Sequence, residues 1–133
     1  MSIVSRLVAV VLLTLSLAAH SGIIQSTYTP LGGNQWSVAF SVTNTGDPAP
    51  VSEFTVFFAE GLFANLAVTG SPGTWDSIVI QPDSGIPADG FFDALVLDQV
   101  DALDNGESQS GFSMTFDFLG SGAPGALPFD FLD

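Results

Sequence analysis

The chain has 133 residues, of which 14 are Asp or Glu, one is Lys or Arg, one is His and none is Cys. The single basic residue is Arg6, and a formal charge of −13 repels polyanions such as nucleic acid and anionic membrane surfaces. Without Cys the chain is not a disulfide scaffold, so its stability must come from apolar burial and hydrogen bonding.

The N-terminal segment has the pattern of a secretory signal peptide. A short region ending at Arg6 precedes an almost unbroken apolar run, residues 7–19, and small residues follow. This run is shorter than the roughly 20 residues that cross a bilayer. Cleavage after Ala18 or after Ser21 fits the small-x-small rule, and the pattern does not choose between them. We assign residues 1–21 to the signal peptide, with a retained membrane anchor as the alternative.

Cleavage leaves residues 22–133, the length of one ordinary domain. All 14 acidic residues lie in this part, the first being Asp47. If the cut follows Ser21, His20 is also removed, and the mature chain contains no Lys, Arg, His or Cys. Nucleophilic catalysis by Ser or Thr then has no His or Lys to act as its base, so no catalytic triad is expected.

Two segments alternate apolar and polar residues, which is the pattern of a half-buried β-strand. The first, residues 35–43, turns its apolar residues to one face: Trp36, Val38, Phe40 and Val42. The second, residues 111–118, does the same with Phe112, Met114, Phe116 and Phe118. Weaker strands are predicted at residues 24–29, 53–58, 65–69, 77–81, 91–97 and 127–131.

Clusters of Gly, Pro, Asn and Asp separate these strands, at residues 31–34, 44–48, 70–73, 82–85, 104–106 and 120–124. Seven or eight short strands with regularly spaced turns predict an all-β antiparallel sandwich of immunoglobulin-like type. Residues 61–66 are expected to form one irregular turn, and residues 120–133 an edge segment held against the domain.

Paired carboxylates are the only acid–base chemistry that this composition leaves. Asp76, Asp83, Asp89 and Asp93 follow Trp75, and two of them beside the indole ring would resemble a glycosidase site. A domain of this size with short loops offers little cleft, so we expect Trp75 in the core and the aspartates in turns. The chain is therefore predicted not to be an enzyme, and no catalytic or cofactor-binding residue is assigned.

A second acidic cluster occurs around the Asn105-Gly106 turn. Its members recur every third residue, at Asp98, Asp101, Asp104 and Glu107. Oxygen ligands in a flexible loop suit Ca²⁺, but this spacing matches no EF-hand loop. The turn is the favoured interpretation, and no metal-ligating residue is assigned.

Aromatic residues offer a third kind of site, a stacking platform for carbohydrate. Trp36 falls on the inward face of its strand, which leaves Tyr28 and Trp75 as candidates for exposed platforms. Two rings do not make a stacking surface, so a sugar site of this kind stays an alternative.

A series of short motifs resembles small exported proteins of the PEP-CTERM sorting-domain class. The motifs lie in residues 36–46, 53–58, 61–66, 71–76, 80–83, 87–93 and 111–129, in this order. The resemblance covers nearly the whole mature chain. It implies a secreted or surface-displayed protein of a Gram-negative bacterium that makes an exopolysaccharide matrix, with no catalytic residues to carry over.

Members of that class end in a Pro-Glu-Pro-like motif, a transmembrane helix and a basic tail, whereas residues 129–133 here show none of these. Either the product is truncated or it is a variant exported without C-terminal processing, and no membrane anchor is expected after signal cleavage. We expect a noncatalytic secreted or surface-associated structural protein of an exopolysaccharide or biofilm matrix. The alternative is an extracellular module that binds polysaccharide or calcium. The expected partners are extracellular polysaccharide or a further copy of the chain.

Overall fold

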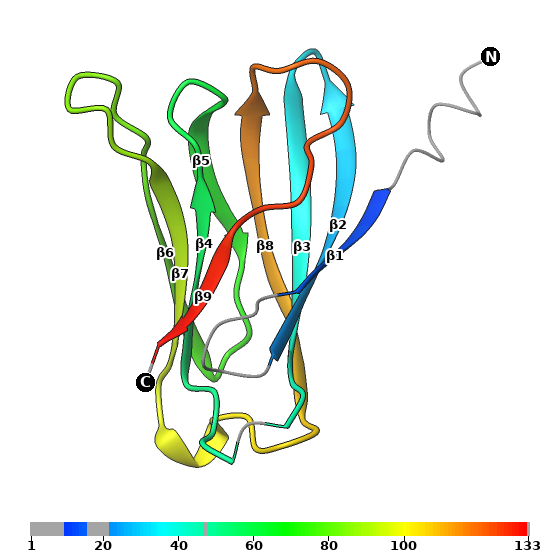
Figure 1. Ribbon diagram of the computed structural model, residues 1–133, viewed down its shortest axis with the longest axis vertical. Helices are drawn as coiled ribbons and strands as arrows, with labels where there is room; N and C mark the ends of the chain where they lie inside the picture. Colours follow the sequence, from blue (N-terminus) through cyan, green and yellow to red (C-terminus); the bar gives the residue numbers. More distant parts are fainter. Residues whose placement is uncertain (1–9, 16–21, 47, 133) are drawn as a thin grey trace.

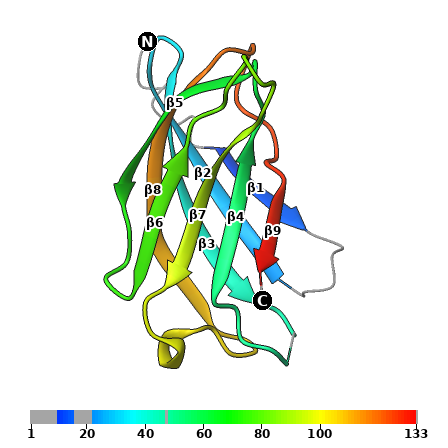
Figure 2. The same cartoon turned by 90° about the vertical axis from the view of Figure 1, so that its left-hand side faces the viewer.

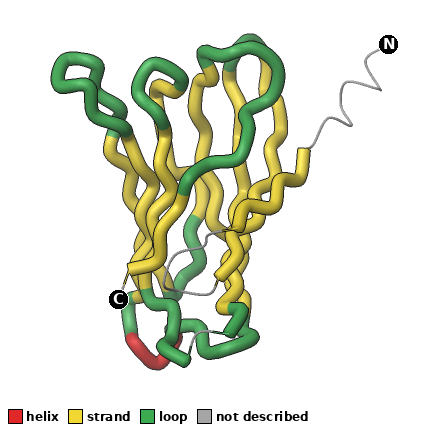
Figure 3. Tube along the Cα trace, in the orientation of Figure 1, coloured by secondary structure: helices red, strands yellow, loops and turns green. Residues whose placement is uncertain are grey.

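Two antiparallel β-sheets face each other and enclose the core of the protein (Figure 1). The computed structural model describes residues 10–15, 22–46 and 48–132. The strands are β1 (Val10–Leu15), β2 (Gly22–Gly32), β3 (Gln35–Asn44), β4 (Glu53–Phe58), β5 (Phe63–Gly70), β6 (Trp75–Ile80), β7 (Gly90–Val96), β8 (Ser108–Phe118) and β9 (Phe129–Leu132). In this part of the chain the one helical element is a single 3-10 turn, η1 (Gln99–Asp101), coloured red in Figure 3.

The larger sheet has the strand order β1-β2-β3-β8-β5, and the smaller one has the order β6-β7-β4-β9 (Figure 2). The prediction of an all-β antiparallel sandwich is confirmed, and each of the eight predicted strands is present, from β2 to β9. The expectation of only an irregular turn at residues 61–66 is wrong, because β5 already begins at Phe63.

The two strands with the clearest alternation are neighbours in the middle of the larger sheet. In the register of β3 with β8, Trp36 lies opposite Phe116 and Phe40 lies opposite Phe112. All four side chains are buried. Because alternate residues of a strand share a face, this pairing collects the apolar halves of both strands on the core side.

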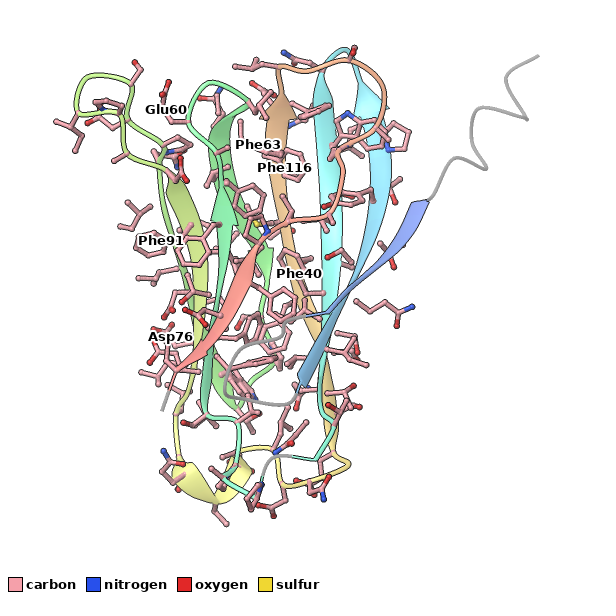
Figure 4. All side chains as sticks on the ribbon, in the orientation of Figure 1. Phe40, Glu60, Phe63, Asp76, Phe91 and Phe116 are labelled. Atoms are coloured by element: carbon pink, nitrogen blue, oxygen red, sulfur yellow. The ribbon has the colours of Figure 1, made fainter. Side chains whose placement is uncertain are left out.

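Phenylalanine forms most of the core between the sheets. Phe54 of β4 meets Phe112 edge to face with ring centroids 5.0 Å apart, and Phe58 lies 5.5 Å from Phe116. Figure 4 shows Phe40, Phe63 and Phe116 between the two sheets. A fully buried side chain of this size contributes about 2 to 3 kcal/mol to folding. These contacts therefore supply much of the stability of a chain that has no disulfide bonds.

The segment after β8 crosses from the larger sheet to the smaller one, where β9 pairs with β4 (Figure 1). Leu127 and Phe131 are buried, and the Tyr28 hydroxyl donates a hydrogen bond of 3.0 Å to the carbonyl oxygen of Gly125. The C-terminal segment is thus held against the domain, as predicted, with β9 as an edge strand.

Strand β1 covers the outer edge of β2. Its register runs from Val10 opposite Tyr28 to Leu15 opposite Ile23. The sequence predicts a signal-peptide apolar region here, whose cleavage positions after Ala18 and Ser21 lie outside the described residues, as do Arg6 and His20. Within residues 10–15, 22–46 and 48–132 there is no helix of the length and apolarity needed to cross a membrane.

Candidate functional site

The aromatic residues considered as sugar platforms belong to the core. Tyr28 is fully buried, with Trp36 and Phe116 at the edges of its ring, so its prediction as an exposed platform is wrong. Burial raises the pKa of the Tyr28 hydroxyl. Trp75 is buried against Phe54, as the favoured interpretation predicted. Stacking on these rings is therefore not available to a ligand.

The aspartates that follow Trp75 are spread over separate structures. Asp83 accepts a 2.8 Å hydrogen bond from the N–H of Gly85, which closes its own turn. Asp89 accepts one of 2.9 Å from the N–H of Glu60 and so ties two loops together. Asp76 is exposed on the outer face of the smaller sheet, on the side away from the core in Figure 4. Asp83 and Asp89 therefore lie in turns or loops, as expected, but the expectation is wrong for Asp76 and Asp93, which lie in strands β6 and β7.

One carboxylate pair was missed by the sequence analysis. Asp93 of β7 accepts a 2.6 Å hydrogen bond from the Thr55 hydroxyl, and the Glu53 carboxyl on β4 also hydrogen-bonds Asp93. This hydrogen bond, partial burial and the neighbouring negative charge raise the pKa of Glu53 to about 7. Both acids occupy outward positions, one on β4 and one on β7. Their proximity can be predicted only when the pairing of β4 with β7 is known.

That pair lies on the outer face of the smaller sheet together with exposed apolar side chains. Ile78, Ile80 and Leu95 are exposed to between 45% and 49% on β6 and β7. Asp130 on β9 faces Thr55 in the register of that sheet, so acids and apolar residues are interspersed over the face. Acids in such an open arrangement do not form the facing pair across a substrate cleft that a glycosidase needs.

The acidic residues around Asn105-Gly106 act within their own turns. Asp98 caps η1 by accepting a 3.1 Å hydrogen bond from the N–H of Val100. Glu107 accepts one of 2.8 Å from the N–H of Asp104. Among the residues that the structure describes, no group of three or more His, Cys, Asp or Glu side chains is placed to hold a metal ion.

The outer face of the larger sheet has a different character, and we call it the hydroxyl face. It comprises the outward residues of β2, β3 and β8: Ile23, Gln25, Thr27, Thr29, Ser37, Ala39, Ser41, Thr43, Ser113, Thr115 and Asp117. Rows of hydroxyl groups run across the strands, since Thr29 lies opposite Ser37 and Ser37 lies opposite Thr115. Asp117 is the single charged member, at one end of β8 beside Asn65.

The hydroxyl face is hollowed where β3 and β8 slip in register. The irregularity between Phe40 and Val42 opens a hollow of about 310 Å³. Its polar lining consists of Gln25, Thr27, Ser41, Ser110 and Ser113. The rest of the lining is apolar and consists of Ala39, Phe40, Gly111 and Phe112. The hollow thus combines apolar surface with uncharged donors and acceptors, which suits an uncharged ligand with hydroxyl groups and offers no charge to an ion.

Sequence alternation marked several of these Ser and Thr residues as outward but could not bring them together. Only the order of β2, β3 and β8 in one sheet makes them a continuous surface. The chain matches no protein-family profile, no curated protein and no solved structure.

Proposed function

We propose that this chain is a noncatalytic structural protein of an extracellular polysaccharide matrix, and that the hydroxyl face is its contact with the polysaccharide. The observation that carries the proposal is the distribution of charge. Although 14 residues are acidic, the outward residues of β2 and β3 that contribute to the hydroxyl face carry no charge. Asp117, at one end of β8, is the single charge on this face, so the rest of a broad surface is uncharged and rich in hydrogen-bonding groups.

Hydroxyl and amide side chains donate and accept hydrogen bonds in the same way as sugar hydroxyls. Each contact is weak, because water competes for the same groups. A long polymer compensates by touching many protein molecules at once, and linked weak contacts give high overall avidity. The surplus of negative charge elsewhere on the protein repels anionic polymers, so a neutral polysaccharide is the expected partner.

The sequence pattern and the PEP-CTERM resemblance support export as the route to this location. Residues 1–21 would be removed as a signal peptide during passage through the inner membrane of a Gram-negative bacterium. Residues 22–133 would then be the working protein, secreted or held at the surface by the matrix.

The strand order supports an immunoglobulin-like type of sandwich. The series β2-β3-β8-β5 has the same order as the A-B-E-D sheet of an immunoglobulin constant-type domain, and β4 takes the place of strand C. The β6–β7 hairpin is then an insertion between the strands equivalent to D and E, and it pairs with the free side of β4.

Binding to a neutral glucan tests the contact surface. Purified protein is sedimented with insoluble cellulose, and alginate serves as the anionic comparison. We expect Ala39→Glu, at an exposed position of the hydroxyl face, to reduce the bound fraction at least several-fold. Ile78→Glu places the same charge on an exposed strand position of the other sheet and should bind like the wild type. Equal binding by both variants, or no binding by the wild type, contradicts the proposed contact.

A second experiment tests the export step. The full chain with a C-terminal epitope tag is produced in a Gram-negative host, the cells are fractionated, and the N-terminus of the product is determined by mass spectrometry. We expect a soluble product outside the cytoplasm that begins near residue 19 or 22. An uncleaved form in the membrane pellet would make the N-terminal segment an anchor.

A further inference from the structure

Three edge strands of the sandwich carry features that hinder pairing with another chain. The free edge of β5 is interrupted by register shifts, and the Gln81 side chain binds both backbone polar groups of Leu66. On β6 the carbonyl oxygen of Trp75 accepts a 3.1 Å hydrogen bond from the Ser71 hydroxyl. Strand β9 is only four residues long and carries Asp130. Bulges, capped backbone groups, short length and charge are the usual ways of preventing edge-to-edge association.

Strand β2 has no such device over residues 22–29. It contains no charged residue, its Pro30 lies near one end, and its bulge falls between Pro30 and Gly32. What covers the edge is β1, which pairs with residues 23–28. The structure therefore shows that this edge accepts an antiparallel strand along six consecutive residues.

We propose that removal of β1 with the signal peptide exposes the edge of β2, which then pairs antiparallel with β2 of a second copy. This inference rests on the proposed export and cleavage. The N-terminal segment acts in the precursor as a cover that delays association until the chain has left the cytoplasm. The two larger sheets then join into one sheet with the order β5-β8-β3-β2-β2-β3-β8-β5.

The alternation of side chains restricts the register of this pairing. Ile24 and Tyr28 are buried on the core side, so directly opposite residues must both be inward or both be outward. The stretch that β1 covers has its middle at Gln25 and Ser26, and a two-fold axis at either residue satisfies this condition. The Gln25 side chains of the two copies then lie close together on the outer face.

Joining the sheets in this way also extends the hydroxyl face. A two-fold axis perpendicular to the sheet keeps both hydroxyl faces on the same side, so the dimer presents one continuous surface of twice the width. Such a surface holds a polymer by two linked sites and not by one.

The acids of both copies oppose association at long range, which predicts stronger dimerisation when salt shortens the Debye length.

The test compares the full chain with residues 22–133. The shorter chain carries the complete core cluster, whose members run from Ile24 to Phe131, and circular dichroism checks its fold. Sedimentation equilibrium in moderate NaCl should give a dimer for residues 22–133 and a monomer for the full chain. In the full chain, Leu13→Pro disturbs the pairing of β1 and should restore dimerisation.

Cysteine cross-linking locates the contact, because the natural chain contains no Cys. Gln25→Cys in residues 22–133 should form a covalent dimer on mild oxidation or with a short bismaleimide. Thr115→Cys, half-buried on the central strand β8 of the same face, should remain monomeric. A folded 22–133 chain that stays monomeric in salt, or one that cross-links equally at both positions, overturns the proposal. Failure of export is detected separately, by the N-terminal mass of the product, and leaves this measurement intact.

Discussion

The side-chain amide of Gln81 binds both backbone polar groups of Leu66. It donates to the Leu66 carbonyl oxygen at 2.7 Å and accepts from the Leu66 N–H at 2.8 Å. Leu66 lies in β5 within the first register shift of that edge strand, between Ala64 and Ala67. One side chain from the segment after β6 thus imitates the pairing that a neighbouring strand would give.

Replacing this amide should both weaken the fold and open the edge. We expect Gln81→Ala to lower the free energy of unfolding by about 1 to 3 kcal/mol, because two hydrogen bonds are lost. The variant should also associate more readily in sedimentation velocity experiments. Gln99→Ala, at an exposed position in η1, is the matched control and should change neither property. Unchanged stability and association of Gln81→Ala would show that the β5 edge is protected by its bulges alone.

The alternating faces predict a second difference, between adjacent positions of β8. Phe116 is fully buried among Tyr28, Phe58 and Phe63, whereas Thr115 faces outward. Phe116→Ala should cost about 3 to 5 kcal/mol through lost burial and a cavity. Thr115→Ala should cost well under that amount. Urea melts of both variants provide the comparison, and similar losses at the two positions would mean that the register of β8 is wrong.

Strand positions and the direction of their side chains could be predicted because alternation is a local property of the sequence. Trp36 and Phe116 were both predicted to point inward, and they do. Their position directly opposite each other could not be predicted, since it depends on which strands become neighbours in the sheet. The hydroxyl face depends on the same strand order, and for that reason it was visible only as separate outward Ser and Thr residues.

Residues whose partners lie far along the chain were predicted least well. Tyr28 sits among Gln25, Ser26 and Thr27, and a phenol in such a polar stretch suggests exposure. Its burial is possible because its hydroxyl donates a hydrogen bond to the Gly125 carbonyl oxygen. Gly125 lies far along the chain, so the sequence around Tyr28 does not predict this contact. Glu53 and Asp93 were not paired for the same reason, since each looks like an ordinary solvated acid on its own strand.

Asn44 is a buried polar residue that joins two loops at one end of the sandwich. Its side-chain N–H groups donate to the carbonyl oxygens of Leu103 at 3.0 Å and Ala49 at 3.2 Å. Asn44→Ala should cost about 1 to 3 kcal/mol through the lost hydrogen bonds. Asn44→Asp should cost more at pH 7, because it buries a charge and places carboxylate oxygens against carbonyl oxygens.

Urea unfolding at pH 7 and pH 4 checks this order. The deficit of Asn44→Asp should shrink at the lower pH, where protonation removes the charge. Asn105→Asp makes the same change at an exposed position of the neighbouring turn and should have little effect at either pH. Equal small losses for the two Asn→Asp variants would show that water reaches Asn44.

The contact between Glu53 and Asp93 makes stability depend on pH near neutrality. The pKa of Glu53 is raised from 4.5 to about 7 in the folded protein, so the folded state holds a proton that the unfolded state releases. The associated stabilisation is complete below pH 4.5 and is lost as the pH rises to about 7.

Glu53→Gln keeps a hydrogen-bond donor toward Asp93 without a charge. We therefore expect its melting temperature to change less than that of the wild type between these pH values, and to exceed the wild-type value at pH 7.5. Asp101→Asn removes an exposed carboxylate of η1 and should leave the slope of the wild-type curve unchanged. Parallel curves for the wild type and Glu53→Gln would mean that both carboxylates are solvated separately and that no proton is shared between β4 and β7.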